Sequence, residues 1–213
     1  MPLTGATNMN GALSALELND SFASNESPLS GGGSWSALQW EDSTSEHDTG
    51  QVSGGWGPYD AFPTINGAFW QPAVFTDTGP GVAAAATLTG NATITERYFS
   101  LWIDMPTPGL TRSGYELRFT ETASYVYTAT LSRWQSGTKT LLASKTGHAM
   151  ALKSQFALVD KGGTVSAWVK SGTEFLQVLS AADTTFYSGY TGIEASGNII
   201  RLNDFRSGPL PPF

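Results

Sequence analysis

The stretch Arg97-Tyr98-Phe99-Ser100-Leu101-Trp102-Ile103-Asp104-Met105 indicates the fold class of this chain. Its side chains alternate, so that one face holds Phe99, Leu101, Ile103 and Met105 and the other holds Tyr98, Ser100, Trp102 and Asp104. Alternation with a period of two predicts a half-buried β-strand. The segment Tyr115–Phe119 repeats the pattern after the turn-forming residues 109–114. A second strand is therefore expected to run back along the first.

Turn signals continue toward the carboxyl end of the chain. The segments Gln135–Lys139 and Asp160–Gly163 each separate two strand-like runs and predict β-hairpins. A further strand at Phe175–Leu179 is expected after the turn Ser171–Thr173. Turns spaced by about 8–12 residues are typical of β-sandwiches and barrels.

The composition agrees with an all-β chain that contains little helix. Of the 213 residues, 24 are glycine and only 14% are charged, which suits short strands joined by tight turns. Helical spacing is confined to Ala12–Leu18 and His148–Ser154, and each segment is long enough for only a turn or two. A chain of this length can bury a full hydrophobic core in one domain.

Charge and cysteine content disfavour several classes of protein. The net charge of −7 repels phosphate backbones and anionic lipids, so no nucleic-acid partner is expected. The absence of cysteine excludes disulfides, thiolate nucleophiles and zinc–thiolate sites. No membrane span is expected, and Met1–Thr7 lacks the pattern of a secretory signal, which favours synthesis in a cytoplasm.

The two ends of the predicted domain resemble each other. Leu18-Asn19-Asp20-Ser21-Phe22 and Leu202-Asn203-Asp204-Phe205 share a pattern that predicts a pair of neighbouring terminal strands. We therefore expect an N-terminal arm at residues 1–17, a jelly-roll domain at residues 18–208 and a Pro-rich C-terminal tail at residues 209–213. Both the arm and the tail are expected to bind other proteins of an assembly.

Several short motifs resemble the concanavalin A-like lectin and glucanase superfamily, which includes laminin G-like modules. They are Asn19-Asp20-Ser21-Phe22, Gly33-Ser34-Trp35, Arg97-Tyr98-Phe99-Ser100-Leu101-Trp102, Gly114-Tyr115-Glu116-Leu117-Arg118-Phe119, Gly163-Thr164-Val165-Ser166-Ala167-Trp168 and Gly189-Tyr190-Thr191-Gly192-Ile193. The combination is similar to small lectin-like minor tail and virion proteins of phages that infect actinobacteria. The resemblance implies a two-sheet antiparallel jelly-roll sandwich of the concanavalin A-like kind.

The superfamily's glucanases carry a Glu-x-Asp-x-x-Glu motif, which this sequence lacks. The nearest segment runs from Glu116 to Glu121, has Arg118 at its centre, and places the two glutamates on opposite faces of a strand. We interpret them as solvated charges on an outer face, with Glu116 beside Arg118. No catalytic residue is therefore predicted.

Acidic side chains offer a candidate calcium site. Asp42, Glu46 and Asp48 lie close together in a polar segment, and Asp20 and Asp204 are expected near each other at the paired ends. Hydrated loop charges and turn-capping carboxylates are the alternative interpretation for both groups. Apart from such structural calcium, no cofactor is expected.

Aromatic residues near the predicted loops are the candidate glycan contacts. Sugars stack their apolar faces on such rings, and the candidates are Trp56, Tyr59, Trp70, Tyr187 and Tyr190. Core or interface packing is the alternative for each of them, and packing is the expected role of the strand residues Trp102, Trp134 and Trp168.

Together these features predict a non-enzymatic phage virion protein, tail-associated and able to bind a host cell-wall glycan. A homo-oligomer within the assembled particle is expected, since repetition makes weak contacts effective. One alternative is a capsid decoration, or cement, protein without a ligand. A second alternative is a secreted glycoside hydrolase or polysaccharide lyase.

Overall fold

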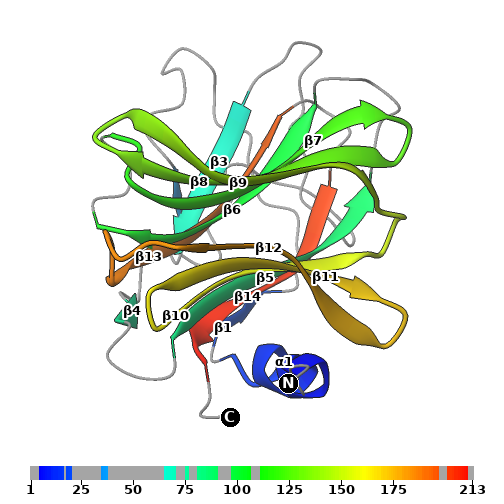
Figure 1. Cartoon of the computed structure of the whole chain (residues 1–213), viewed down its shortest axis with the longest axis horizontal. Coiled ribbons are helices and arrows are strands. Elements are labelled where there is room, and N and C mark those ends of the chain that lie inside the picture. The colour runs from blue at the N-terminus through cyan, green and yellow to red at the C-terminus, as the bar shows by residue number, and fades with distance from the viewer. Residues whose placement is uncertain are drawn as a thin grey trace.

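The computed structural model describes residues 5–16, 18–20, 35–37, 65–70, 75–76, 81–90, 97–106, 111–196 and 201–210. Within these residues the chain forms two antiparallel β-sheets stacked face to face, and a short helix covers the outer side of one of them (Figure 1). The predicted all-β, two-sheet antiparallel sandwich with little helix is confirmed.

The strands of each sheet are not arranged in sequence order. The smaller sheet has the order β1 (Leu18–Asp20), β14 (Arg201–Pro209), β5 (Val82–Gly90), β10 (Gln155–Lys161), β11 (Thr164–Ser171) and β12 (Glu174–Ala182). The larger sheet has the order β2 (Trp35–Ala37), β3 (Ile65–Trp70), β13 (Ser188–Ser196), β6 (Tyr98–Met105), β7 (Gly114–Ala123), β8 (Val126–Gln135) and β9 (Thr138–Ala149). A short strand, β4 (Phe75–Thr76), also pairs with β13.

The main core lies between the two sheets. It contains the inward side chains of β6 and β7, which meet those of β5, β10 and β11. Phe99, Phe119 and Phe156 are fully buried there, with ring centroids 5.0–5.5 Å apart. Such close aromatic contacts add to the burial of apolar area and hold the sheets in one alignment.

The prediction that β6 is half-buried is wrong, because every one of its residues is buried. Phe99, Leu101 and Ile103 face the main core as expected. Met105 does not, and instead packs beside Trp102 on the other face of the strand. Asp104 has a φ of +53°, which interrupts the alternation just before Met105.

The hairpin predictions are confirmed. Strands β8 and β9 are joined across Ser136 and Gly137, and β10 and β11 across Gly162 and Gly163. The helix predictions are only partly right. A helix, α1 (Gly5–Ser14), forms earlier than Ala12–Leu18, and His148 belongs to strand β9. No helix in the described part of the chain is long and apolar enough to cross a membrane.

The two terminal strands pair as predicted, with Leu18 opposite Ser207 and Asp20 opposite Phe205. Strand β14 continues to Pro209, one residue beyond the predicted end of the jelly roll. The next residue, Leu210, is buried, and its amide donates to the carbonyl of Gly81 at 2.8 Å.

Helix α1, which lies in the predicted N-terminal arm, packs on the outer face of the smaller sheet (Figure 1). The contact consists of Met9, Ala12, Leu13 and Leu16 against Ala83, Ala85, Ala157, Val159, Phe175 and Leu210. Strand β5 is therefore buried on both faces, which explains its continuous apolar run. Its small alanine side chains let the helix approach the sheet closely.

Candidate functional site

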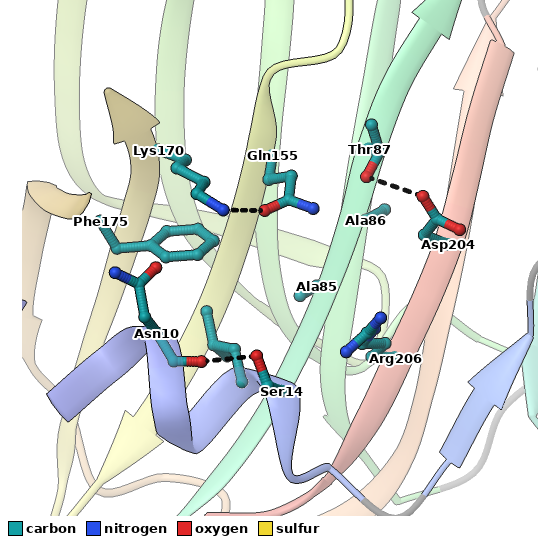
Figure 2. Close-up of a pocket in the computed structure, with 11 residues that line it drawn as sticks. Asn10, Ser14, Ala85, Ala86, Thr87, Gln155, Lys170, Phe175, Asp204 and Arg206 are labelled. Atoms are coloured by element: carbon teal, nitrogen blue, oxygen red, sulfur yellow. Dashed lines mark hydrogen bonds between the residues drawn. The ribbon is translucent and has the colours of Figure 1, made fainter. Parts of the chain in front are cut away.

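A cavity of about 120 Å³ lies between helix α1 and the outer face of the smaller sheet, and we call it the α1 pocket (Figure 2). Its lining residues are Asn10, Leu13 and Ser14 from α1 and Ala85, Ala86, Thr87, Gln155, Lys170, Phe175, Asp204 and Arg206 from the sheet. The sheet residues come from β5, β10, β11, β12 and β14, which are neighbours in the sheet.

Strand register brings these side chains together. Lys170 lies opposite Phe175, Gln155 opposite Thr87, and Arg206 opposite Ala85. Because side chains of directly paired residues point to the same face of a sheet, each pair projects toward the helix. The pocket is thus formed by strand positions that are far apart in the sequence.

The polar side chains of the α1 pocket are partly bonded to each other. Lys170 Nζ donates to Gln155 Oε1 at 3.0 Å, and Thr87 Oγ1 donates to Asp204 Oδ2 at 3.4 Å (Figure 2). Asn10 Nδ2 donates to the backbone carbonyl of Thr173 at 2.6 Å, which ties the helix to the turn before β12. These bonds hold the side chains in place and leave other donors and acceptors for a ligand.

Arg206 differs from the other polar residues of the pocket. Its side chain forms no hydrogen bond and no ion pair with the part of the chain that the structure describes. Its neighbour Asp204 turns its carboxylate toward Thr87 instead (Figure 2). A guanidinium has five N–H donors in a fixed plane and suits planar acceptors such as carboxylates.

The α1 pocket also has an apolar side. Phe175 is only 3% exposed and packs with Ala85 beneath the helix. Lys170 Nζ lies 5.9 Å from the centre of the Phe175 ring, within the range of a cation–π contact. The buried ring therefore gives the pocket an apolar wall beside its hydrogen-bonding groups.

A second group of polar residues occupies the outer face of the larger sheet, and we call it the carboxylate cluster. It comprises Tyr98, Ser100, Trp102, Arg112, Glu116, Arg118, Trp134, Lys139 and Glu194. The side chains of Glu116 and Glu194 are fully buried. They project from β7 and β13, the two strands that flank β6.

Each carboxylate oxygen in the cluster has a donor. Glu116 Oε1 accepts from Ser100 at 3.0 Å and from Arg118 at 2.6 Å, and Glu116 Oε2 accepts from Trp134 at 2.8 Å. Glu194 Oε1 accepts from Tyr98 at 2.7 Å, and Glu194 Oε2 accepts from Trp102 at 2.9 Å.

Cations balance the two buried acids. Arg118 bridges them, with Nη2 3.3 Å from Glu194 Oε1, while Arg112 and Lys139 each lie 3.6 Å from one of the carboxylates. Burial and, next, the charge of Glu116 raise the pKa of Glu194. The two carboxylates raise the pKa of Arg118, although burial alone would lower it. Because all these groups are bonded within the chain, the cluster is built to hold strands together.

The interpretation of Glu116 and Glu121 as solvated charges is wrong, because Glu116 is 0% exposed and Glu121 is 1% exposed. The predicted contact between Glu116 and Arg118 is confirmed. Glu121 faces away from Glu116, and its carboxylate accepts from the backbone amide of Tyr125 at 3.2 Å. The acid that does lie with Glu116 is Glu194.

The candidate glycan aromatics are not brought together by the described residues. Tyr187 is 53% exposed between β12 and β13, and Tyr190 packs against Trp102 and Met105. Trp70 ends strand β3, and its side chain is not described. Two further candidates, Trp56 and Tyr59, lie outside the described residues. Neither Tyr187 nor Tyr190 lines the α1 pocket, and the role of all five as glycan contacts stays a prediction.

Of the candidate calcium ligands, Asp204 lines the α1 pocket, and Asp20 pairs with its neighbour Phe205 on β14. The residues that the structure describes contain no group of three or more His, Cys, Asp or Glu side chains placed to hold a metal. Asp42, Glu46 and Asp48 lie outside the described residues.

Sequence reasoning missed Glu194 and every residue of the α1 pocket except Asp204, which it had named as a candidate calcium ligand. Glu194 alternates with Ile193 and Ala195, which marks it as an outer-face residue, but only the pairing of β13 with β6 places it near Glu116. Arg206 follows the buried Phe205, so alternation likewise marks it as an outer-face residue. The docking of α1, which completes the pocket, has no local sequence signal.

No known family model matches the chain, and no curated protein is significantly similar to it in sequence. Solved structures with a similar fold do exist. The CBM2 module of the evolved Dit of Lactobacillus casei BL23 phage J-1 has a TM-score of 0.61 at 7% identity, and the match covers 92% of this chain and 96% of that module.

Two other similar structures are named for sugar recognition. The carbohydrate-binding module CBM66 from Bacillus subtilis has a TM-score of 0.57 at 11% identity, covering 83% of this chain and 96% of the module. The exoplasmic/lumenal domain of VIP36, in a form bound to Ca²⁺ and Man3GlcNAc, has a TM-score of 0.60 at 11% identity, covering 84% of this chain and 85% of that domain. The chain therefore has the lectin-like jelly-roll fold that these carbohydrate-binding domains share.

Proposed function

We propose that this chain is a non-enzymatic glycan-binding protein of a bacteriophage particle, associated with the tail. The observation that carries glycan binding is the α1 pocket, whose lining combines amide, hydroxyl and charged side chains with the largely buried ring of Phe175. Sugar hydroxyls need hydrogen-bond partners, and the lining of the pocket supplies both donors and acceptors. The lectin-like fold supports the same use, although one fold can host many functions.

A place in a phage particle is supported by the likeness to the phage J-1 module and by the sequence resemblance to phage tail proteins. In this proposal the protein is made in the host cytoplasm, assembles with other virion proteins and presents repeated copies to a host cell-wall glycan. Gly11 and Ala15 are exposed positions of the predicted arm outside the α1 pocket, and they are open to other virion proteins.

The buried acid pair supports a non-enzymatic role. A glycosidase needs one carboxyl group at the sugar's reacting carbon and another at the leaving oxygen. Here the side chains of Glu116 and Glu194 are 0% exposed, and their oxygens are bonded to Arg118, Trp102 and Trp134. If they were nevertheless catalytic, reducing ends would be released from wall polysaccharides and the release would disappear in Glu116→Gln.

Glycan binding at the α1 pocket is tested with a matched pair of substitutions. Ser14 and Ala15 are both exposed at the end of α1, but only Ser14 lines the pocket. On an array of host-wall oligosaccharides, we expect Ser14→Trp to abolish binding by filling the cavity and Ala15→Trp to leave it unchanged. Equal binding by both variants, or no binding by the natural chain, would refute the proposal.

The place in the particle is tested separately by quantitative mass spectrometry of purified virions. We expect the chain in the particle at a copy number that matches a tail ring or tail tip. A copy number that matches the capsid lattice would instead favour the capsid decoration protein. Absence of the chain from the particle would refute both the tail protein and the capsid decoration protein.

A further inference from the structure

We infer that the α1 pocket selects carboxylated sugars, such as hexuronates, over neutral sugars. This inference rests on the glycan-binding function proposed above and specifies the ligand of the same pocket. Three lining residues, Arg206, Lys170 and Asp204, give the pocket this preference through their charges and hydrogen bonds.

The pocket is positive although the chain as a whole is negative. Two lining residues, Lys170 and Arg206, are cations and one, Asp204, is an anion, while the whole chain has a net charge of −7. A local positive site in a negative protein raises the local concentration of anions only at that place. The electrostatic field of the pocket therefore favours a ligand with one negative charge.

Arg206 is the residue that supplies the binding group for such a charge. It lines the pocket, is partly buried, and has no hydrogen-bond or ion-pair partner among the described residues. A partly buried guanidinium without a partner gains two parallel hydrogen bonds when a carboxylate arrives. No ion pair with Asp204 competes, because that carboxylate accepts from Thr87.

Lys170 contributes charge rather than a direct contact. Its ammonium is already held by Gln155 Oε1 at 3.0 Å and lies near the Phe175 ring. Figure 2 places Lys170 and Arg206 on different sides of the pocket, with Ala85 and Ala86 between them. A ligand with its carboxylate at Arg206 therefore has its ring over the alanines, toward Phe175.

The remaining lining groups fit hydroxyls. Asp204 and the carbonyl oxygen of an amide accept hydrogen bonds from hydroxyls, and the amide nitrogens of Asn10 and Gln155 donate to them. An inorganic anion such as sulfate can accept from the amide nitrogens, but it has no hydroxyl to donate to Asp204. The cavity of about 120 Å³ is well below the about 300–1,000 Å³ of sites for larger ligands, which limits the ligand to a single sugar unit at the end or branch of a glycan.

The test compares ligands and charges on the full chain. Sodium D-glucuronate and methyl β-D-glucoside are titrated by NMR into the natural chain, Arg206→Gln and Lys145→Gln. Arg206→Gln removes the pocket's unpaired charge, and Lys145→Gln removes an equal charge at an exposed position outside the pocket. We expect glucuronate to bind the natural chain about 10-fold more tightly than the glucoside. Arg206→Gln should abolish that preference, and Lys145→Gln should retain it.

The outcomes separate the two proposals. If both sugars bind equally and Arg206→Gln changes nothing, the preference for acidic sugars is wrong, while glycan binding stands. If neither sugar binds and the wall oligosaccharides also fail, glycan binding itself is wrong. If sodium acetate binds the pocket as tightly as glucuronate does, the pocket is a site for small anions. Selection of a sugar is then refuted.

Discussion

Glu116 and Glu194 lie on two different strands of the larger sheet, and both of their carboxylates contact the same guanidinium group, that of Arg118. Since β6 separates the two strands, the shared cation joins three strands at one point. The cation also lies over the ring of Tyr98, at 3.7 Å from its centre. The outer face of this sheet is therefore held by a network of charged hydrogen bonds in addition to the apolar core beneath it.

Replacement of Arg118 by methionine should be strongly destabilising. The variant keeps much of the side-chain volume but leaves Glu116 and Glu194 without their shared cation. We expect the free energy of unfolding to fall by about 3–5 kcal/mol, as for other broken buried ion pairs. Urea unfolding at neutral pH measures it, and Lys145→Met at an exposed site is the control, with a change of less than about 0.5 kcal/mol. A small loss in Arg118→Met would mean that the carboxylates are solvated.

The raised pKa of Glu194 predicts a pH dependence of stability. Burial, followed by the charge of Glu116, favours the protonated carboxyl in the folded state. The group therefore stabilises the fold below its unfolded pKa of about 4.3, and this contribution is lost as the pH rises through its higher folded pKa. Glu194→Gln cannot ionise.

We thus expect the difference in unfolding free energy, Glu194→Gln minus natural chain, to become more positive as the pH rises above about 4. Urea unfolding at several pH values checks this result. Parallel pH profiles for the two proteins would show that the folded state does not shift the pKa of Glu194.

Two glycines should differ sharply in their tolerance of alanine. Gly114 has a φ of +124°, and a Cβ there would lie 2.8 Å from the carbonyl oxygen of Ile103. Gly137 has a φ of +81° but has open space around a Cβ. We expect Gly137→Ala to cost about 1 kcal/mol from backbone strain alone and Gly114→Ala to cost clearly more. Thermal unfolding followed by circular dichroism compares them, and equal losses would contradict the expected clash.

The docking of helix α1 should depend on Leu13. This side chain is only 4% exposed and packs in the cluster between helix and sheet. Leu13→Ala should weaken the docking by about 2–5 kcal/mol, and the amides of α1 should exchange with solvent faster. Hydrogen exchange measures this effect, with Leu152→Ala as a control because Leu152 is 43% exposed. Unchanged exchange in α1 would show that the helix does not rely on this contact.

Local sequence patterns predict several of the strands and the hairpin turns, but not strand β5, the strand at His148 or the burial of the outer faces. Alternation correctly separated Phe99, Leu101 and Ile103 from Tyr98 and Trp102. It could not show that the second face is buried too, because that depends on contacts with distant segments. Glu116 was misjudged for the same reason, since a lone glutamate on a strand is ordinarily solvated.

The α1 pocket was out of reach of the sequence because it depends on sheet order and helix docking. Lys170, Thr87 and Arg206 come together only through the order β14-β5-β10-β11-β12. The helix segment was noticed for its spacing, but its position on the sheet follows from the small side chains of Ala83 and Ala85. Complementary surfaces of this kind are a tertiary property, which no single stretch of sequence encodes.

The pairing of β1 with β14 has a mechanical consequence. Leu18, where the chain enters the strand, lies opposite Ser207, near where the chain leaves. Tension applied to the segments that flank β1 and β14 therefore acts at the same end of this strand pair. It breaks the backbone hydrogen bonds between the two strands one after another. Strands loaded in shear would break all their bonds at once. A module of this topology yields first at the docked helix α1 and then at the seam between β1 and β14, while β14, the other strands and the core between the sheets stay in place.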